Sequence, residues 1–202
     1  MTLLIILITV IASLLAFSSP QIMSKWMLNP YTVYKKNEWW RFFTSGLIHA
    51  DFMHLGLNML VFYSFGQAVE YYFDDIFDAR GGYYFVILYL GGMLISSAPT
   101  YSKQKNNYLY NSLGASGAVS AILFAAIMLN PWNKVYIMGI FGLPGIVFGP
   151  LYLFLEHRLS VQSNDNINHD AHFWGAVFGF LFPILLKPEL GLDFIKILTE
   201  GP

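Results

Sequence analysis

Cysteine is missing from all 202 residues of the chain. Its absence excludes disulfide bonds, thiolate metal sites and cysteine nucleophiles, and it leaves the redox compartment undetermined. Charged residues are scarce as well, at 11% of the chain, whereas an ordinary soluble domain carries about 25%. With a formal net charge of -1, the chain offers no basic footprint for nucleic acid and no charge excess to steer an acidic substrate.

Apolar side chains take the place of the missing charges: 56% of the residues are hydrophobic and 18% are aromatic. Most of such a chain cannot face water, and a high aromatic content is typical of the interfacial belts of membrane proteins. The composition therefore predicts a multi-pass, all-α membrane protein in a lipid bilayer. No internal repeat and no soluble domain is apparent, so we expect residues 1–202 to form a single membrane domain.

Six apolar stretches approach the length of about 20 residues that a helix needs to cross a bilayer. The chain therefore predicts six transmembrane helices, at about 3–18, 47–72, 83–98, 114–130, 144–158 and 170–186. We interpret the first as a span rather than a signal peptide, because no Lys or Arg precedes it and no clear cleavage site follows it. Residues 20–45, rich in Trp and cations, predict an interfacial first loop, and residues 188–202 predict a short amphipathic tail.

Reactive or ionisable side chains at membrane depth are costly, so each is a functional hypothesis. Ser116 lies in the first turn of the fourth predicted helix, where free N–H groups and the positive end of the helix dipole favour an oxyanion. Serine needs an adjacent base to act as a nucleophile. Taken alone, Ser116 with Gly114 and Gly117 predicts a small-residue packing face more readily than a catalytic site.

His172, in the first turn of the sixth predicted helix, is a suitable base. An imidazole with a pKa of about 6.5 is mostly neutral at pH 7 and can accept the serine proton. Gly175, Ala176 and Gly179 follow on the same helix face, and the fourth helix offers small residues in the same manner. Two smooth faces let backbones approach, so we expect Ser116 and His172 within hydrogen-bond distance. The alternative for His172 is a histidine wetted at a helix mouth.

His54 and Asn58 are four residues apart and share a face of the second predicted helix. Together with the N–H of Ser116, their side chains could hydrogen-bond a tetrahedral oxyanion. The alternative is a polar clamp between helices, worth about 1 kcal/mol. His49 lies about 140° around the helix from His54, so the pair is poorly placed to bind one metal ion, and we interpret His49 as a strut to the preceding loop.

A zinc site is the main chemical rival, since the chain has five histidines. The helical metalloprotease pattern H-E-x-x-H is absent. His157 follows Glu156 near the end of the fifth predicted helix, but no histidine stands four residues further on. The sequence therefore predicts neither a metal ion nor another cofactor. His169 and Asp170 are expected at the wet mouth of the sixth helix, and no catalytic role is assigned to Asp170.

From Trp39 to about Phe182 the chain resembles the rhomboid family. The family's motif G-x-S-G stands at 114–117, its motif A-H-x-x-G-x-x-x-G at 171–179, and its pattern of two histidines and an asparagine at His49, His54 and Asn58. Trp40-Arg41 is similar to the family's Trp-Arg motif, and Gly66 with Glu70 to its G-x-x-x-E motif. A lone G-x-S-G is a weak signal, whereas all five motifs in this order and spacing are specific.

The resemblance implies an intramembrane serine protease that cuts transmembrane segments of membrane-protein partners near a small residue. Ser116 would be the nucleophile and His172 the general base, as a dyad without a required carboxylate. His54, Asn58 and the N–H of Ser116 would form the oxyanion hole. The motif residues His49, Gly114, Gly117, Gly175 and Gly179 would support them. The glycine- and proline-rich fifth helix and the polar loop after it resemble the family's movable gate.

Some features depart from the family or leave alternatives open. Ser120 stands where the family more often has an aromatic residue that packs against the catalytic histidine. The Lys and Arg count favours the membrane orientation opposite to the family's. A non-catalytic relative that binds or escorts membrane clients is the first alternative, and a proton-relaying transporter, which predicts repeats that the chain lacks, is the second. Absent cysteines and short loops suit a prokaryotic inner membrane, and nothing indicates the oligomeric state.

Overall fold

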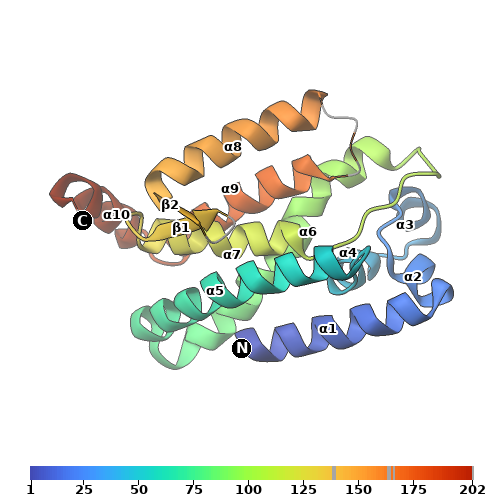
Figure 1. The fold of residues 1–202 in the computed structure, drawn as a ribbon, viewed down its shortest axis with the longest axis horizontal. Coiled ribbons are helices and arrows are strands. Elements are labelled where there is room, and N and C mark those ends of the chain that lie inside the picture. The colour runs from blue at the N-terminus through green and yellow to red at the C-terminus, as the bar shows by residue number, and fades with distance from the viewer. Residues whose placement is uncertain (138–139, 163–164, 166, 202) are drawn as a thin grey trace.

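A computed structural model describes residues 1–137, 140–162, 165 and 167–201. Six long helices lie side by side in a bundle, which α6 crosses obliquely (Figure 1). They are α1 (Thr2–Ser18), α5 (Phe52–Phe77), α6 (Gly81–Gln104), α7 (Ser116–Leu129), α8 (Gly145–Gln162) and α9 (His169–Leu186). A helix therefore occupies each of the six ranges predicted from the sequence.

The number of membrane crossings is a separate matter from the number of helices. Within the described residues, two helical stretches are both long and apolar enough to cross a bilayer: Phe52–Gln104, which contains α5 and α6, and α9. Helices α1 and α7 are apolar but shorter. The six helices are present, whereas six crossings stay a prediction.

Helix α5 begins later than the sequence predicts. It starts at Phe52 rather than near Leu47, because the Asp51 side chain caps it by accepting a hydrogen bond of 2.8 Å from the N–H of His54. The apolar pattern before residue 52 belongs to a short 3₁₀ turn, Ser45–Leu47, and to the segment that follows. His49 therefore lies outside the helix, where the sequence placed it inside.

Helices α6 and α8 both end later than predicted. Helix α6 passes through Pro99 and ends at Gln104, and helix α8 ends at Gln162 rather than by Arg158. A proline removes one backbone hydrogen bond, and helices tolerate it where packing holds them. Thr100, directly after the proline, is buried. The polar loop predicted after α8 lies partly outside the described residues.

The first loop is folded into short helices, α2 (Pro20–Trp26), α3 (Pro30–Lys36) and α4 (Arg41–Thr44). Arg41 is buried and holds them together. Its Nε donates to Glu38 at 2.6 Å, and its Nη1 donates to the carbonyls of Ser24 and Met27 at 3.1 and 2.8 Å. The loop is thus an ordered layer beside α1 and α6 rather than an extended connection.

Two further elements lie between α7 and α8 and after α9. Strands β1 (Lys134–Ile137) and β2 (Phe141–Pro144) form an antiparallel hairpin, a small departure from the predicted all-α fold. Helix α10 (Glu189–Glu200) occupies the predicted amphipathic tail, and the indole of Trp132 donates to its Ile197 carbonyl at 2.9 Å. Gly and Pro disfavour helix interiors, which explains why the hairpin interrupts the helical pattern.

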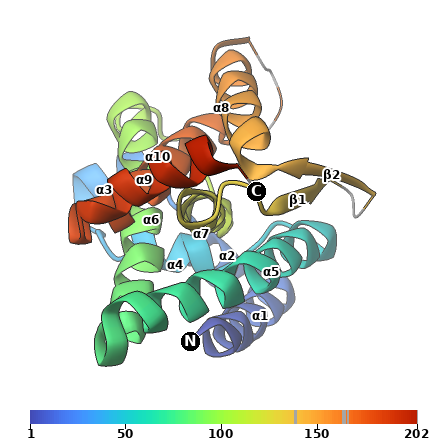
Figure 2. The ribbon, with the colours of Figure 1, turned by 90° about the vertical axis from the view of Figure 1, so that its left-hand side faces the viewer.

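Helix α7 is the centre of the bundle. Every residue from Gly117 to Met128 is buried. Viewed along the bundle, α5, α6, α8 and α9 surround it (Figure 2). A helix that is apolar all round is expected in such a position.

Glycines on α9 allow it to approach α7 closely. A Cβ added at Gly175 would lie 2.1 Å from the carbonyl oxygen of Gly117, and one added at Gly179 would lie 2.0 Å from that of Ala121. Gly117 also faces α6, where a Cβ would lie 2.3 Å from the Ser96 hydroxyl oxygen. The smooth faces predicted from the sequence are therefore in direct backbone contact, as small-residue interfaces between membrane helices are.

Gly179→Ala tests this contact. The added methyl group meets backbone, which cannot move aside, so we expect the free energy of unfolding to fall by about 2 kcal/mol or more. Thermal unfolding in detergent micelles measures the change. Gly56→Ala on α5 is the matched control, because nothing lies within 4 Å of its added Cβ. It should be neutral or stabilising by up to about 1 kcal/mol, and equal melting temperatures for the two variants would contradict the proposed packing.

Candidate active site

The segment before α7 is held in a defined shape. Gly114 has φ +115, a conformation that side chains other than glycine rarely adopt. Its N–H donates to the carbonyl of Ser45 at 2.9 Å, and the next N–H, of Ala115, donates to Nε2 of His49 at 3.3 Å. Two hydrogen bonds to the same preceding loop thus fix where Ser116 begins the helix.

His49 links three parts of the chain at this point. It is fully buried, and its Nδ1 lies 3.0 Å from the hydroxyl of Ser13 on α1. Because Nε2 accepts from Ala115, a neutral His49 carries its proton on Nδ1 and donates it to Ser13. The Ser13 hydroxyl in turn donates to the carbonyl of Leu47 at 3.1 Å. Each donor in this chain of hydrogen bonds thus has an acceptor. His49 connects α1, the loop before α5 and the segment before α7.

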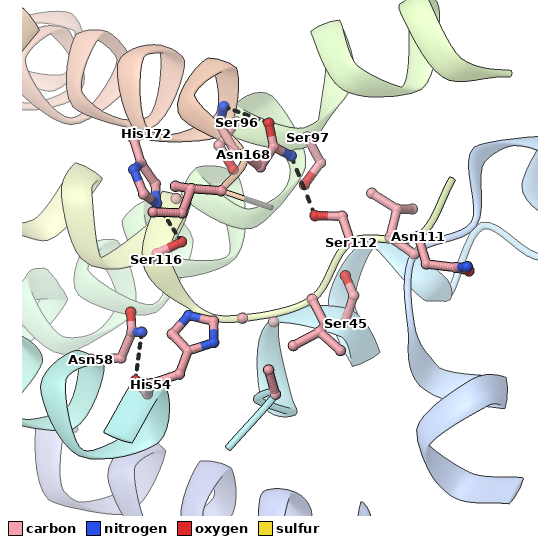
Figure 3. Close-up of a pocket in the computed structure, with 18 of the residues that line it drawn as sticks. Ser45, His54, Asn58, Ser96, Ser97, Asn111, Ser112, Ser116, Asn168 and His172 are labelled. Carbon is pink, nitrogen blue, oxygen red and sulfur yellow. Dashed lines mark hydrogen bonds between the residues drawn. The ribbon is translucent and has the colours of Figure 1, made fainter. Parts of the chain in front are cut away.

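Ser116 and His172 meet across the α7–α9 contact. The hydroxyl oxygen of Ser116 lies 2.8 Å from Nε2 of His172, and Figure 3 shows the two side chains pointing toward each other. Asn168 caps α9 by accepting from the N–H of Ala171 at 3.2 Å, and it also accepts from the Thr100 hydroxyl at 3.0 Å. The first turn of α9, and His172 with it, is therefore anchored to α6.

His54 and Asn58 face the same hollow from α5. The ring of His54 lies against Gly114, where an added Cβ would be 2.6 Å from its Cε1. The Asn58 amide donates to the backbone carbonyl of His54 at 2.9 Å, which uses one of its two hydrogens (Figure 3). Both residues line the pocket that contains Ser116 and His172.

This pocket has a volume of about 940 Å³. Ligand sites commonly fall between about 300 and 1,000 Å³. Its lining combines the four polar side chains above with further polar groups from the first loop, α6 and the segment before α7, and with apolar ones such as Met53 and Leu57. It is large enough to admit an extended stretch of peptide together with water.

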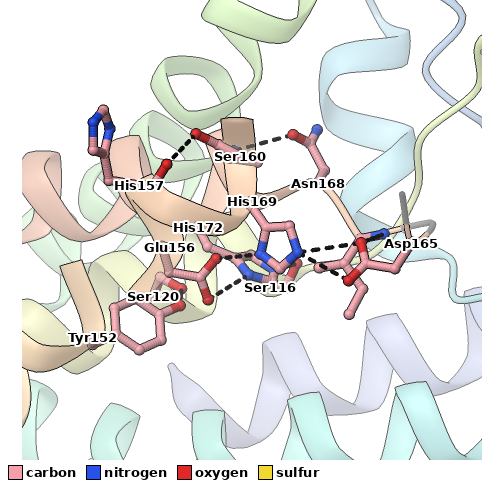
Figure 4. Close-up of polar contacts among 12 residues, drawn as sticks. Ser116, Ser120, Tyr152, Glu156, His157, Ser160, Asp165, Asn168, His169 and His172 are labelled. Carbon is pink, nitrogen blue, oxygen red and sulfur yellow. Dashed lines mark hydrogen bonds and ion pairs between the residues drawn. The ribbon is translucent and has the colours of Figure 1, made fainter. Parts of the chain in front are cut away.

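A carboxylate on α8, which sequence reasoning did not select, reaches the same histidine. Glu156 Oε1 lies 3.2 Å from Nδ1 of His172, and Oε2 lies 2.6 Å from Nδ1 of His169 (Figure 4). His169 is buried rather than wet, and its Nε2 lies 3.2 Å from both carboxylate oxygens of Asp165. The expectation of a solvated His169 is therefore wrong. Asp170 forms an ion pair with the exposed Lys103, with 2.6 Å between its Oδ2 and the lysine Nζ.

The three groups around Glu156 also meet a geometric condition for holding a metal. One ligand atom from each of Glu156, His169 and His172 falls within 4.8 Å of the other two. Hydrogen bonds already account for every one of these atoms, with both imidazole Nδ1–H groups donating to one carboxylate. Since no cation is needed to explain the arrangement, the hydrogen-bonded interpretation is the simpler one.

Comparison with known proteins agrees with this architecture. A family model described as "Rhomboid domain" matches residues 36–189. RHOMBOID-like protein 5 of Arabidopsis thaliana is 29% identical over 171 residues, which are 83% of this chain and 51% of that protein. The Bacillus subtilis protein YdcA is 31% identical over 73% of this chain and 67% of its own length. Rhomboid protease GluP of the same bacterium is 28% identical over 81% of this chain, which spans 29% of GluP.

Gly114→Ala should displace the segment that carries Ser116. The new methyl group would be strained by the positive φ and would push against the His54 ring. A shift of about 1 Å in reacting groups can cost about 100-fold in rate, so we expect a loss of that order in reaction with a fluorophosphonate probe.

The control for this variant is Gly82→Ala at the start of α6, where the added Cβ would make only ordinary contacts, at 3.6 Å or more. It should react at the parental rate. Parental reactivity in Gly114→Ala would show that the glycine conformation is not needed for the site.

Proposed function

The chain belongs to the rhomboid family, and on that premise we propose that it is a serine protease that cuts membrane-spanning segments of other proteins. The observation that carries the proposal is the distance of 2.8 Å between the Ser116 hydroxyl oxygen and His172 Nε2, at the wall of a pocket. A serine hydroxyl bonded to the unprotonated nitrogen of an imidazole is the arrangement that nucleophilic catalysis requires.

In the first half of the proposed reaction, His172 acts as general base. Nε2 takes the hydroxyl proton while the Ser116 oxygen attacks the scissile carbonyl carbon and forms a tetrahedral intermediate. The intermediate collapses as the protonated imidazole gives its proton to the leaving amine, which releases one product. A water molecule then repeats the two steps on the acyl ester and restores the free serine.

The negative oxygen of the tetrahedral intermediate needs hydrogen-bond donors. We assign this role to His54, to the Asn58 amide and to the N–H of Ser116 at the start of α7. The hydrogen of Asn58 that is not bonded to the His54 carbonyl is available for it. Loss of one such donor in other serine proteases costs about 10² to 10³ in rate.

The substrate class follows from the setting of the site. Rhomboid proteins are embedded in membranes, and a helical substrate segment must unwind locally before its carbonyl can be attacked, because its amides are otherwise bonded within the helix. The pocket offers polar side chains that can hold water and unpaired peptide groups beside apolar ones such as Met53 and Leu57. A small residue at the cleavage point would enter most readily.

The location that we propose is the cytoplasmic membrane of a prokaryote, on the basis of short loops and the absence of cysteine. Relatives include proteins of Bacillus subtilis and plant proteins named as mitochondrial or chloroplastic. The compartment thus differs among the relatives, and the cytoplasmic membrane is the finer part of the proposal.

Reaction of the detergent-purified protein with a fluorescent fluorophosphonate tests the proposal. We expect Ser116→Ala to abolish labelling and His172→Ala to reduce its rate by more than about a thousandfold, since serine and histidine of such a pair act as a unit. Labelling is measured in gel against time. A non-catalytic client-binding protein would show no labelling that depends on these residues.

Two matched controls accompany the experiment. Ser64→Ala removes an exposed hydroxyl that bonds the Leu60 carbonyl on α5, and His157→Ala removes an exposed imidazole of α8. Both should label as the parent does. Equal labelling of the parent and Ser116→Ala would refute the assigned nucleophile.

A further inference from the structure

The second nitrogen of the His172 ring faces a carboxylate from a different helix. We propose that Glu156 is a positioning residue for His172, which orients the imidazole and fixes its tautomer from α8, so that the base is fully assembled when α8 is seated against α9. The inference rests on the proposed function above. It adds a third member, supplied in this chain by α8, to the Ser116–His172 pair.

The directions of the hydrogen bonds support this role. An ionised carboxylate can only accept hydrogen bonds, so Glu156 accepts from Nδ1–H of His172. A neutral imidazole with its proton on Nδ1 has a bare Nε2, and Nε2 is the atom that lies 2.8 Å from the Ser116 hydroxyl. Glu156 therefore selects the tautomer that can take the serine proton. It would also stabilise the imidazolium that forms in the reaction.

His169 holds the carboxylate in place. Its Nδ1 lies 2.6 Å from Oε2 of Glu156, while both oxygens of Asp165 lie 3.2 Å from its Nε2. A carboxylate lies at each ring nitrogen of His169, an arrangement that favours an imidazole donating from both nitrogens. The contact with His169 fixes the orientation of the Glu156 carboxylate and leaves Oε1 directed at His172, as Figure 4 shows.

Polar contacts add to the apolar packing that holds helix α8 in place. Of its described residues only two glycines are fully buried, and large apolar side chains such as Phe154 and Leu155 are exposed. Others, such as Phe148 and Leu153, are partly buried against the core. Tyr152, one turn before Glu156, forms a hydrogen bond of 2.8 Å with Ser120 of α7. Ser120 is itself one turn after Ser116.

Two polar side chains of α8 thus dock beside the reactive pair, one on α7 and one on α9. Movement of α8 away from the bundle would break both contacts. The His172 ring would then lose the partner that fixes its tautomer. The position of α8 and the orientation of the His172 ring are therefore linked.

The decisive variant is Glu156→Gln, which keeps size and shape but removes the charge. We expect its second-order rate constant with the fluorophosphonate at pH 7 to fall by about 10- to 100-fold, less than the loss of about 10⁴ for the buried aspartate of a Ser-His-Asp triad. The rate should rise with pH, because the proposed reaction needs a neutral base. A carboxylate stabilises the imidazolium form of a neighbouring ring, so we expect its removal to move the midpoint of this pH profile to lower pH.

Two further variants separate positioning from folding. Glu156→Asp keeps the charge with a shorter reach, so we expect a slower reaction whose pH midpoint stays closer to that of the parent than the midpoint of Glu156→Gln. Asp170→Asn is the matched control, because it removes a carboxylate from the same turn of α9 that bonds Lys103 rather than His172. It should leave both rate and midpoint unchanged. Melting temperatures of all variants show whether each is folded.

Several results would overturn the inference. An unchanged rate and pH midpoint in a folded Glu156→Gln would leave the reactive pair standing and remove Glu156 from it. A rate loss without a shift in the midpoint of the pH profile would show that Glu156 only holds α8 in place. Loss of parental labelling with a chelator, restored by Zn²⁺, would assign Glu156, His169 and His172 to a metal ion. A parent that reacts with no probe at any pH would refute the proposed function itself, and the inference with it.

Discussion

The hydrogen bond between Ser116 and His172 requires two helix backbones to lie almost in contact. Each side chain is short, so a distance of 2.8 Å between the hydroxyl and the imidazole leaves little space between α7 and α9. Gly175 and Gly179 provide that approach, because any Cβ there would overlap carbonyl oxygens of α7. In lipid the hydrophobic effect does not drive helices together, and close van der Waals packing takes its place. The contacts that stabilise the bundle are thus the same ones that place Ser116 beside His172.

Much of the helical layout could be predicted from apolar run lengths and from proline and charge. The Ser116–His172 contact could be predicted too, since small residues at helical spacing on two helices determine which faces meet. The residues at which helices begin were harder to predict. Helix α5 begins after Asp51 because the Asp51 side chain caps it with a hydrogen bond, which an apolar pattern does not reveal. The hairpin at 134–144 was missed for a related reason, because glycine and proline exclude helix without specifying what replaces it.

Glu156 was overlooked because its partners are distant in the sequence. It appeared as a charge near the end of the fifth helix, next to a histidine without a suitable partner. The signal was an ionisable residue within a predicted span, which by itself calls for a functional explanation. Its two imidazole partners lie on α9, beyond a polar loop, and only tertiary packing brings them within 2.6 to 3.2 Å. His169 was misjudged for the same reason.

The proposed catalysis depends on a reactive Ser116, and mass-spectrometric mapping of the probe adduct tests that point most directly. Proteolytic peptides of the fluorophosphonate-treated parent should carry the added mass at Ser116, and the same peptide from His172→Ala should carry almost none. Modification of a different serine in the parent, or equal modification of Ser116 with and without His172, would contradict the central claim that the two residues act as a catalytic pair.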